Sequence, residues 1–143
     1  MMKLKTILII VPLLIVLLYS FTYVPHKIFD INPDEVSKIH IVDGNSGYRM
    51  DITSEPEINR IIKNLNEVTF KKGKLSAGYM GYRFDTTIYD TNDEPMKELI
   101  INSSDTIRYK GFFYTSTDTE LEYEFIDELV EKSVSNQENQ NQD

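Results

Sequence analysis

Few residues in this chain could do chemistry. It has no cysteine and only two histidines, His26 and His40, so a thiol nucleophile and zinc sites built from Cys and His are excluded. His40 could act as a general base, but no nucleophile-elbow glycine pattern accompanies it. We therefore interpret both histidines as solvated or partly exposed side chains, and we predict neither catalytic residues nor a cofactor.

One segment has the oxygen-bearing side chains of a calcium loop. Asp90, Asn92 and Glu94 occupy the first, third and fifth positions of such a loop. However, Pro95 stands where the sharp turn requires glycine, and Ile101 stands where a bidentate glutamate is needed. The segment is therefore predicted to be a hairpin turn and not a metal site.

Aromatic side chains are concentrated in the second half of the chain. They are Tyr79, Tyr82, Phe84, Tyr89, Tyr109, Phe112, Phe113 and Tyr114. Packing within strands is one interpretation, since strands are enriched in aromatic residues. Recognition of a partner is the other, because Tyr79, Met80 and Tyr82 lie in or beside a glycine-rich loop. We place the candidate partner-binding site at these three residues.

Charge limits the classes of partner. The net charge is −8, and Lys3 and Lys5 are the only charged side chains before residue 25. This balance argues against nucleic-acid binding and against lying flat on an anionic membrane. Three lysines around Gly73 (residues 71–74) could contact an anionic polymer or lipid headgroups, although a solvated helix end explains them as well. Acidic residues within 120–131 fit the solvated face of a helix.

Residues 6–24 carry no charged side chain. A helix of this length measures about 28 Å, near the thickness of the hydrocarbon core of a bilayer. Because Lys3 and Lys5 precede it, we predict a transmembrane signal-anchor with the rest of the chain outside the cytoplasm. The alternative is a signal peptide cleaved near Ser20 and Thr22, which would give a secreted domain.

The remaining sequence alternates between strand and helix patterns. Apolar alternation between turn-forming residues predicts strands at 36–42, 48–53, 82–90, 96–102 and 106–115. Capping-box patterns followed by apolar stripes predict helices from about 55 to 70 and from 117 to 132. The stripes are Ile58, Ile61, Ile62 and Leu65 in the first helix, and Phe125, Ile126 and Leu129 in the second.

This order of elements, ββαβββα, predicts an α+β two-layer sandwich in which an antiparallel five-stranded sheet carries two helices on one face. One N-terminal transmembrane helix precedes it. The expected organisation is a cytoplasmic N-terminus (1–5), the signal-anchor (6–24), a linker (25–35), the extracytoplasmic domain (36–132) and a disordered polar tail (133–143).

The layout resembles that of small, single-span, uncharacterised extracytoplasmic proteins of low-GC Gram-positive bacteria. The likeness rests on the MMKLK start, the apolar stretch, the lead-in Asn32-Pro33-Asp34-Glu35, and the unit from Ser37 to Leu65. Many proteins of that kind are lipoproteins, and this chain lacks the lipid-bearing cysteine. The resemblance concerns layout and assigns no role to any residue.

These observations favour a membrane-tethered, non-catalytic binding or regulatory module. Its expected partners are the lipid bilayer, through residues 6–24, and an envelope protein or cell-wall polymer. An immunity or inhibitor protein that covers a toxin or enzyme is the first alternative. A hydrolase working through carboxylates such as Asp85 is the second, and it requires a cleft with paired acids.

Overall fold

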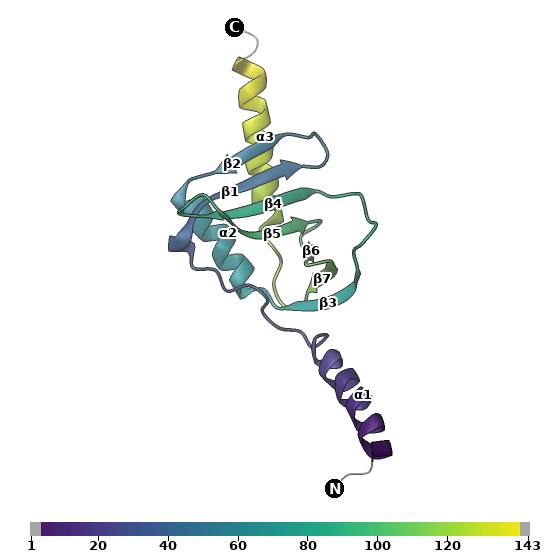
Figure 1. Cartoon of the computed structure of the whole chain (residues 1–143). Helices are drawn as coiled ribbons and strands as arrows, with labels where there is room; N and C mark the ends of the chain where they lie inside the picture. Colours follow the sequence, from purple (N-terminus) through teal and green to yellow (C-terminus); the bar gives the residue numbers. More distant parts are fainter. Residues whose placement is uncertain (1–3, 141–143) are drawn as a thin grey trace.

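The computed structural model describes residues 4–140. Along the chain the elements are α1 (Leu4–Phe21), the 3-10 helix η1 (Pro33–Glu35), β1 (Val36–Asp43), β2 (Arg49–Ile52), α2 (Glu55–Glu67), β3 (Phe70–Leu75), β4 (Phe84–Asp90), β5 (Pro95–Ile101), β6 (Thr106–Tyr109), β7 (Phe112–Ser116) and α3 (Tyr123–Gln140). Figure 1 shows a sheet with helices against it, with α1 extending from one end and α3 from the other. The predicted α+β class is confirmed.

The seven strands form one antiparallel sheet in the order β2-β1-β4-β5-β6-β7-β3. The predicted number of five strands is wrong for two reasons. Residues 106–115 are two strands, because Lys110 (φ 47°) and Gly111 (φ 81°) form a tight turn of the kind that closes hairpins. In addition, residues 70–75 form β3 at the far edge of the sheet, beside β7, although three of them are lysines.

Helices α2 and α3 bury their apolar stripes in the same core. The whole predicted stripe of α2 is buried: Ile58, Ile61, Ile62 and Leu65. In α3, Ile126 and Val130 are buried, whereas Phe125 and Leu129 are only partly buried. The opposite face of the sheet, hereafter the open face, has no helix among residues 4–140 packed on it, and it carries alternate residues such as His40 and Asp85.

The segment predicted to be a linker belongs to the core. Phe29 and Ile31 are 3% and 2% exposed, and the Phe29 ring packs edge-on against Phe70 at 6.0 Å. The Asn66 side chain accepts from the backbone N–H of Ile31 and donates to its carbonyl, at 2.9 and 2.7 Å. Residues 25–35 therefore hold the start of the domain against α2 and the sheet, and they do not act as a spacer.

The prediction of a transmembrane helix over residues 6–24 is wrong. Among the residues that the structure describes, none of the helices is long and apolar enough to cross a membrane. Helix α1 ends at Phe21. After it, the backbone N–H groups of Thr22, Tyr23 and Val24 each donate to the carbonyl three residues earlier, which forms a tight turn. About 20 helical residues are needed to span a bilayer, and the turn removes the last part of the predicted stretch.

The C-terminal segment also differs from the prediction. Helix α3 continues to Gln140, so residues 133–140 are helical where the sequence predicts a disordered tail. Val134 packs against the core as a partly buried side chain, which extends the contact of the helix by one turn. Residues 141–143 lie outside the described part of the chain.

Candidate functional site

The predicted site residues lie in the connection between β3 and β4. We call residues 75–82 the presenting loop. Tyr79, Met80 and Tyr82 are 51%, 90% and 38% exposed, and Leu75 at the start of the loop is 61% exposed. Between residues 25 and 137, no large hydrophobic side chain other than these four is exposed. The loop therefore concentrates the exposed apolar surface of the folded domain.

Arg108 on β6 holds this loop against the open face. Its two terminal nitrogens donate to the carbonyl oxygens of Tyr79, at 2.7 Å, and of Gly81. The side chain is nearly buried, and Nε lies buried with no hydrogen-bond partner among the described residues. Because a guanidinium has five donors in a rigid fork, one arginine fixes two carbonyls of an irregular segment.

Tyr79 packs over the neighbouring strand. Its ring meets Phe113 of β7 edge-on, with centroids 5.0 Å apart. The ammonium of Lys74 donates to the Tyr79 hydroxyl at 2.6 Å and lies 4.6 Å from the centre of its ring. Half of Tyr79 thus supports the loop and the other half remains available, while Met80 beside it contributes almost nothing to the core.

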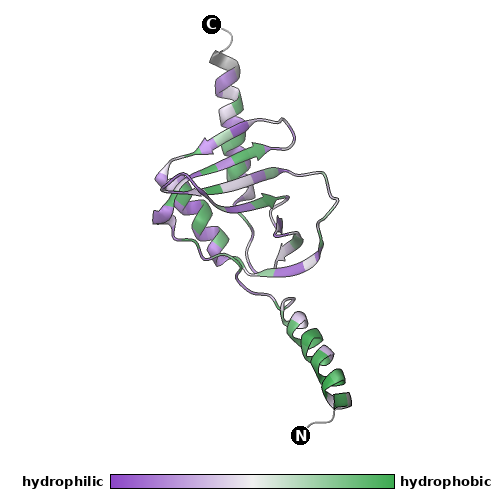
Figure 2. Cartoon of the chain, viewed as in Figure 1, coloured by the Kyte–Doolittle hydropathy of each residue, from purple (hydrophilic) through white to green (hydrophobic). Residues whose placement is uncertain are grey.

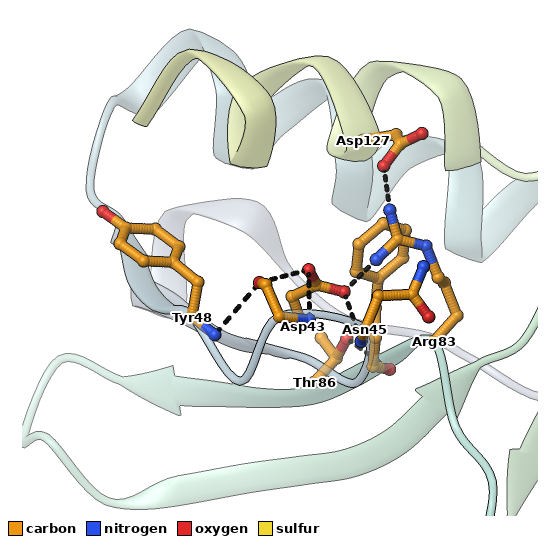
Figure 3. A network of polar contacts seen from close by, with 8 residues as sticks. Asp43, Asn45, Tyr48, Arg83, Thr86 and Asp127 are labelled. Carbon is orange, nitrogen blue, oxygen red and sulfur yellow. Dashed lines mark hydrogen bonds and ion pairs between the residues drawn. The ribbon is translucent and has the colours of Figure 1, made fainter. Parts of the chain in front are cut away.

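A partly buried ion-pair network holds the far end of the loop (Figure 3). Asp43 at the end of β1 accepts from the backbone N–H groups of Asn45, at 3.1 Å, and Ser46, at 3.2 Å, and from the guanidinium of Arg83. The other terminal nitrogen of Arg83 donates to Asp127 on α3. Arg83, the residue after the loop, therefore joins the β1–β2 turn to the final helix.

Gly44 allows the same turn to approach the loop closely. Its backbone N–H donates to the Arg83 carbonyl at 2.7 Å. A Cβ atom at this position would lie 2.0 Å from the carbonyl oxygen of Tyr82. Only a residue without a side chain fits there, so glycine is required by close approach of two backbones.

No protein family model, curated protein or solved structure matches this chain. The resemblance in layout to extracytoplasmic proteins therefore stays an expectation.

Two acidic side chains lie near the loop on the open face. Asp85 and Glu98 line a shallow hollow together with Arg108 and Lys110. Both carboxylates are exposed, which is not the water-excluded environment that tunes a catalytic acid. Within residues 4–140, no group of three or more acidic or histidine side chains could hold a metal ion.

The other candidate residues have structural roles. Asp90 accepts from the backbone N–H groups of Glu94, at 2.9 Å, and Asn92, at 2.8 Å, which holds the pKa of its carboxyl below the usual value. The predicted hairpin turn between β4 and β5 is confirmed. His40 contacts Asp51 at 2.6 Å on the open face, and the backbone of His26 pairs with Phe70 at the edge of β3. Among these residues, His26 pairs with β3, the strand that leads into the presenting loop, and it does so at the start of that strand.

Sequence reasoning did not identify Asp43, Arg83 and Arg108, which hold the loop in place. One signal was present. Arg108 occurs in an alternating strand pattern (TIRY), and a charged residue within a central strand of a sheet indicates a partner above the sheet. The partner proved to be backbone carbonyls of a loop remote in sequence, which no local pattern specifies.

Proposed function

We propose that this chain is a non-catalytic binding module that recognises a partner protein, such as an envelope protein, through the presenting loop. The single observation that carries the proposal is the exposure of Leu75, Tyr79, Met80 and Tyr82 in one stretch that the rest of the domain holds firmly. Exposed apolar side chains gathered in one place are typical of interaction sites.

The chemistry of the loop favours a protein partner. Tyrosine provides a large contact area with few rotatable bonds, and methionine adapts its shape to an apolar pocket. Hydrogen bonds from Arg108 to two loop carbonyls reduce the entropy that would be lost on binding. Binding would thus bury side chains that are already in position.

Delivery of the domain outside the cytoplasm is part of this proposal, because basic residues before an apolar stretch are typical of exported chains.

Met80→Ser should abolish most partner capture without weakening the fold. Met80 is 90% exposed, so its replacement should change the free energy of unfolding by less than about 0.5 kcal/mol. A central apolar contact of an interface is commonly worth about 2 kcal/mol or more, which is roughly a thirtyfold loss of affinity. The measurement is capture from an envelope extract by the immobilised chain, followed by titration with the purified partner that mass spectrometry identifies.

The matched control for this experiment is Thr53→Ser, an exposed position at the opposite edge of the sheet. It should leave capture unchanged. Equal capture by Met80→Ser and the parent chain would contradict the proposal. A captured enzyme or toxin that the chain inhibits would assign the module to the inhibitor class, and a captured polysaccharide would assign it to cell-wall recognition.

We propose a lipid bilayer as a second partner, in contact with α1. The supporting observation is that the apolar side chains along this helix are exposed. Each of Leu8, Ile9, Leu13 and Val16 is more than 50% exposed. Figure 2 shows α1 mostly in the hydrophobic colour, against the mixed colours of the domain. Apolar surface of this extent gains free energy when lipid replaces water.

The full chain should float with neutral phosphatidylcholine vesicles in a density gradient. Substituting Ile9 and Val16 by aspartate should shift the chain to the bottom of the gradient, because charged side chains are costly to bring into hydrocarbon. Replacing Lys63 and Lys132 by aspartate, both exposed on the domain, should not change flotation. A parent chain that stays at the bottom would refute lipid contact by α1.

A further inference from the structure

Charge is distributed unevenly over this acidic protein. Residues 68–84 and 106–117 contain no aspartate or glutamate, and together they form β3, β6, β7 and the presenting loop. The sheet order places these three strands side by side at one end of the sheet. We call the three lysines on β3, Lys71, Lys72 and Lys74, the basic edge.

The lysines of the basic edge have no acidic partner within 4.0 Å among the described residues, whereas Lys38 and Arg83 elsewhere are paired. Lys71 and Lys74 are exposed and Lys72 is half-buried. Asp118, one of the acidic residues that flank these two segments, accepts from the backbone N–H of Thr69 before β3 begins. The net charge of −8 therefore hides a local positive surface on the outer strand.

Helix α1 ends next to this surface. The ammonium of Lys72 lies 5.3 Å from the ring centre of Tyr19 and 5.2 Å from that of Tyr23, and 3.8 Å from that of Phe112. Figure 1 shows α1 leaving the domain beside β3. Exposed apolar side chains, tyrosine rings and unpaired lysines thus follow one another from α1 to β3.

We propose that the basic edge binds the anionic headgroups of the lipid surface that α1 contacts. Apolar, aromatic and cationic groups in this order match the hydrocarbon, the interface and the charged headgroup layer of a bilayer. Each lysine near an anionic surface strengthens binding by about fivefold, and the effect extends over roughly one Debye length, about 8 Å. The repulsion expected from the acidic remainder of the domain is weaker because, within the sheet, the acidic side chains lie on β1, β2, β4 and β5.

This inference rests on the proposed lipid contact of α1, and it fixes which side of the domain faces the headgroups. The chain has no cysteine, so one introduced cysteine takes a fluorophore at one site only. Thr115 is exposed and lies opposite Lys71 in the register of β7 and β3. Thr53 is exposed beside β2, the strand at the opposite edge of the sheet.

The experiment uses the full chain labelled at Thr115→Cys or Thr53→Cys, with vesicles carrying a headgroup quencher. One set is phosphatidylcholine, and the other contains phosphatidylglycerol as well. The label at residue 115 should be quenched strongly with phosphatidylglycerol and weakly without it, and the label at residue 53 should be quenched in neither. Lys71→Gln with Lys74→Gln should weaken the phosphatidylglycerol-dependent binding by about 25-fold, whereas Lys63→Gln with Lys132→Gln should leave it unchanged.

Equal quenching of residue 115 in both kinds of vesicle would overturn the inference, as would unchanged quenching in the Lys71/Lys74 variant. Binding of soluble polyphosphate that is tighter than binding to the anionic vesicles would also overturn it and would assign the basic edge to a polymer. Flotation with neutral vesicles reports on α1 alone, so a chain that floats but shows no dependence on phosphatidylglycerol refutes the inference and leaves the lipid contact of α1 standing.

Discussion

Arg83→Ala is expected to lower the free energy of unfolding by about 3–5 kcal/mol. The guanidinium pairs with Asp43, whose side chain is 6% exposed, and with Asp127 on α3. Removing the cation leaves the Asp43 charge buried with only neutral donors around it. Urea denaturation followed by circular dichroism measures the loss.

Arg60→Ala is the matched control. Arg60 also pairs with a carboxylate of the segment before α3, that of Glu122, but its side chain is 51% exposed. An exposed pair of this kind contributes about 1 kcal/mol or less. Equal losses in the two variants would contradict the role given to the burial of Asp43. Adding Asp43→Asn to Arg83→Ala should restore part of the stability, because it removes the unpaired charge.

Gly44→Ala is expected to destabilise the domain by about 1–3 kcal/mol and to displace the presenting loop. The added methyl group would lie 2.0 Å from the Tyr82 carbonyl oxygen, so either the β1–β2 turn or the end of the loop must move. Hydrogen exchange should show lost protection at the N–H of Gly44, which donates to Arg83. Partner capture should fall with it.

Gly81→Ala tests whether the effect is steric. A Cβ at Gly81 would meet no atom within 4 Å, although this residue lies in the same loop. The substitution should change stability by less than about 0.5 kcal/mol. Comparable losses at Gly44 and Gly81 would mean that loop flexibility, and not close approach to the turn, explains the requirement for glycine.

Local patterns in the sequence predicted much of the fold. The stripe of α2 and the hairpins β1–β2 and β4–β5 follow from apolar periodicity and turn residues, which act over a few positions. The strand β3 was missed because its lysines and Gly73 have low strand preference, and pairing with β7 overrides that preference. The Lys110-Gly111 turn was missed because lysine is an unusual first residue for a left-handed turn.

The candidate site could be predicted only in part. Glycines around Tyr79 and Met80 indicated a loop with prominent side chains, and the structure shows these side chains exposed. The contacts that hold the loop come from Arg108, Asp43 and Phe113, which are distant in sequence. Such contacts depend on strand order, and strand order is not encoded in any short segment. The total charge of −8 likewise does not show that residues 68–84 and 106–117 lack acidic side chains.

The position of β3 has a consequence for the order of folding. Its strand neighbour is β7, and Phe70 pairs with Ser116, which is 46 positions later in the chain. Closing so long a loop is slow, and the pairing cannot begin before β7 has been synthesised. His26 in turn pairs with Phe70, so the segment before β1 contacts the same late-pairing strand. A nascent or truncated chain that lacks β6 and β7 would have neither Arg108 nor Phe113 to hold Tyr79. Tyr79 would therefore be held in place only after both of these strands have been made.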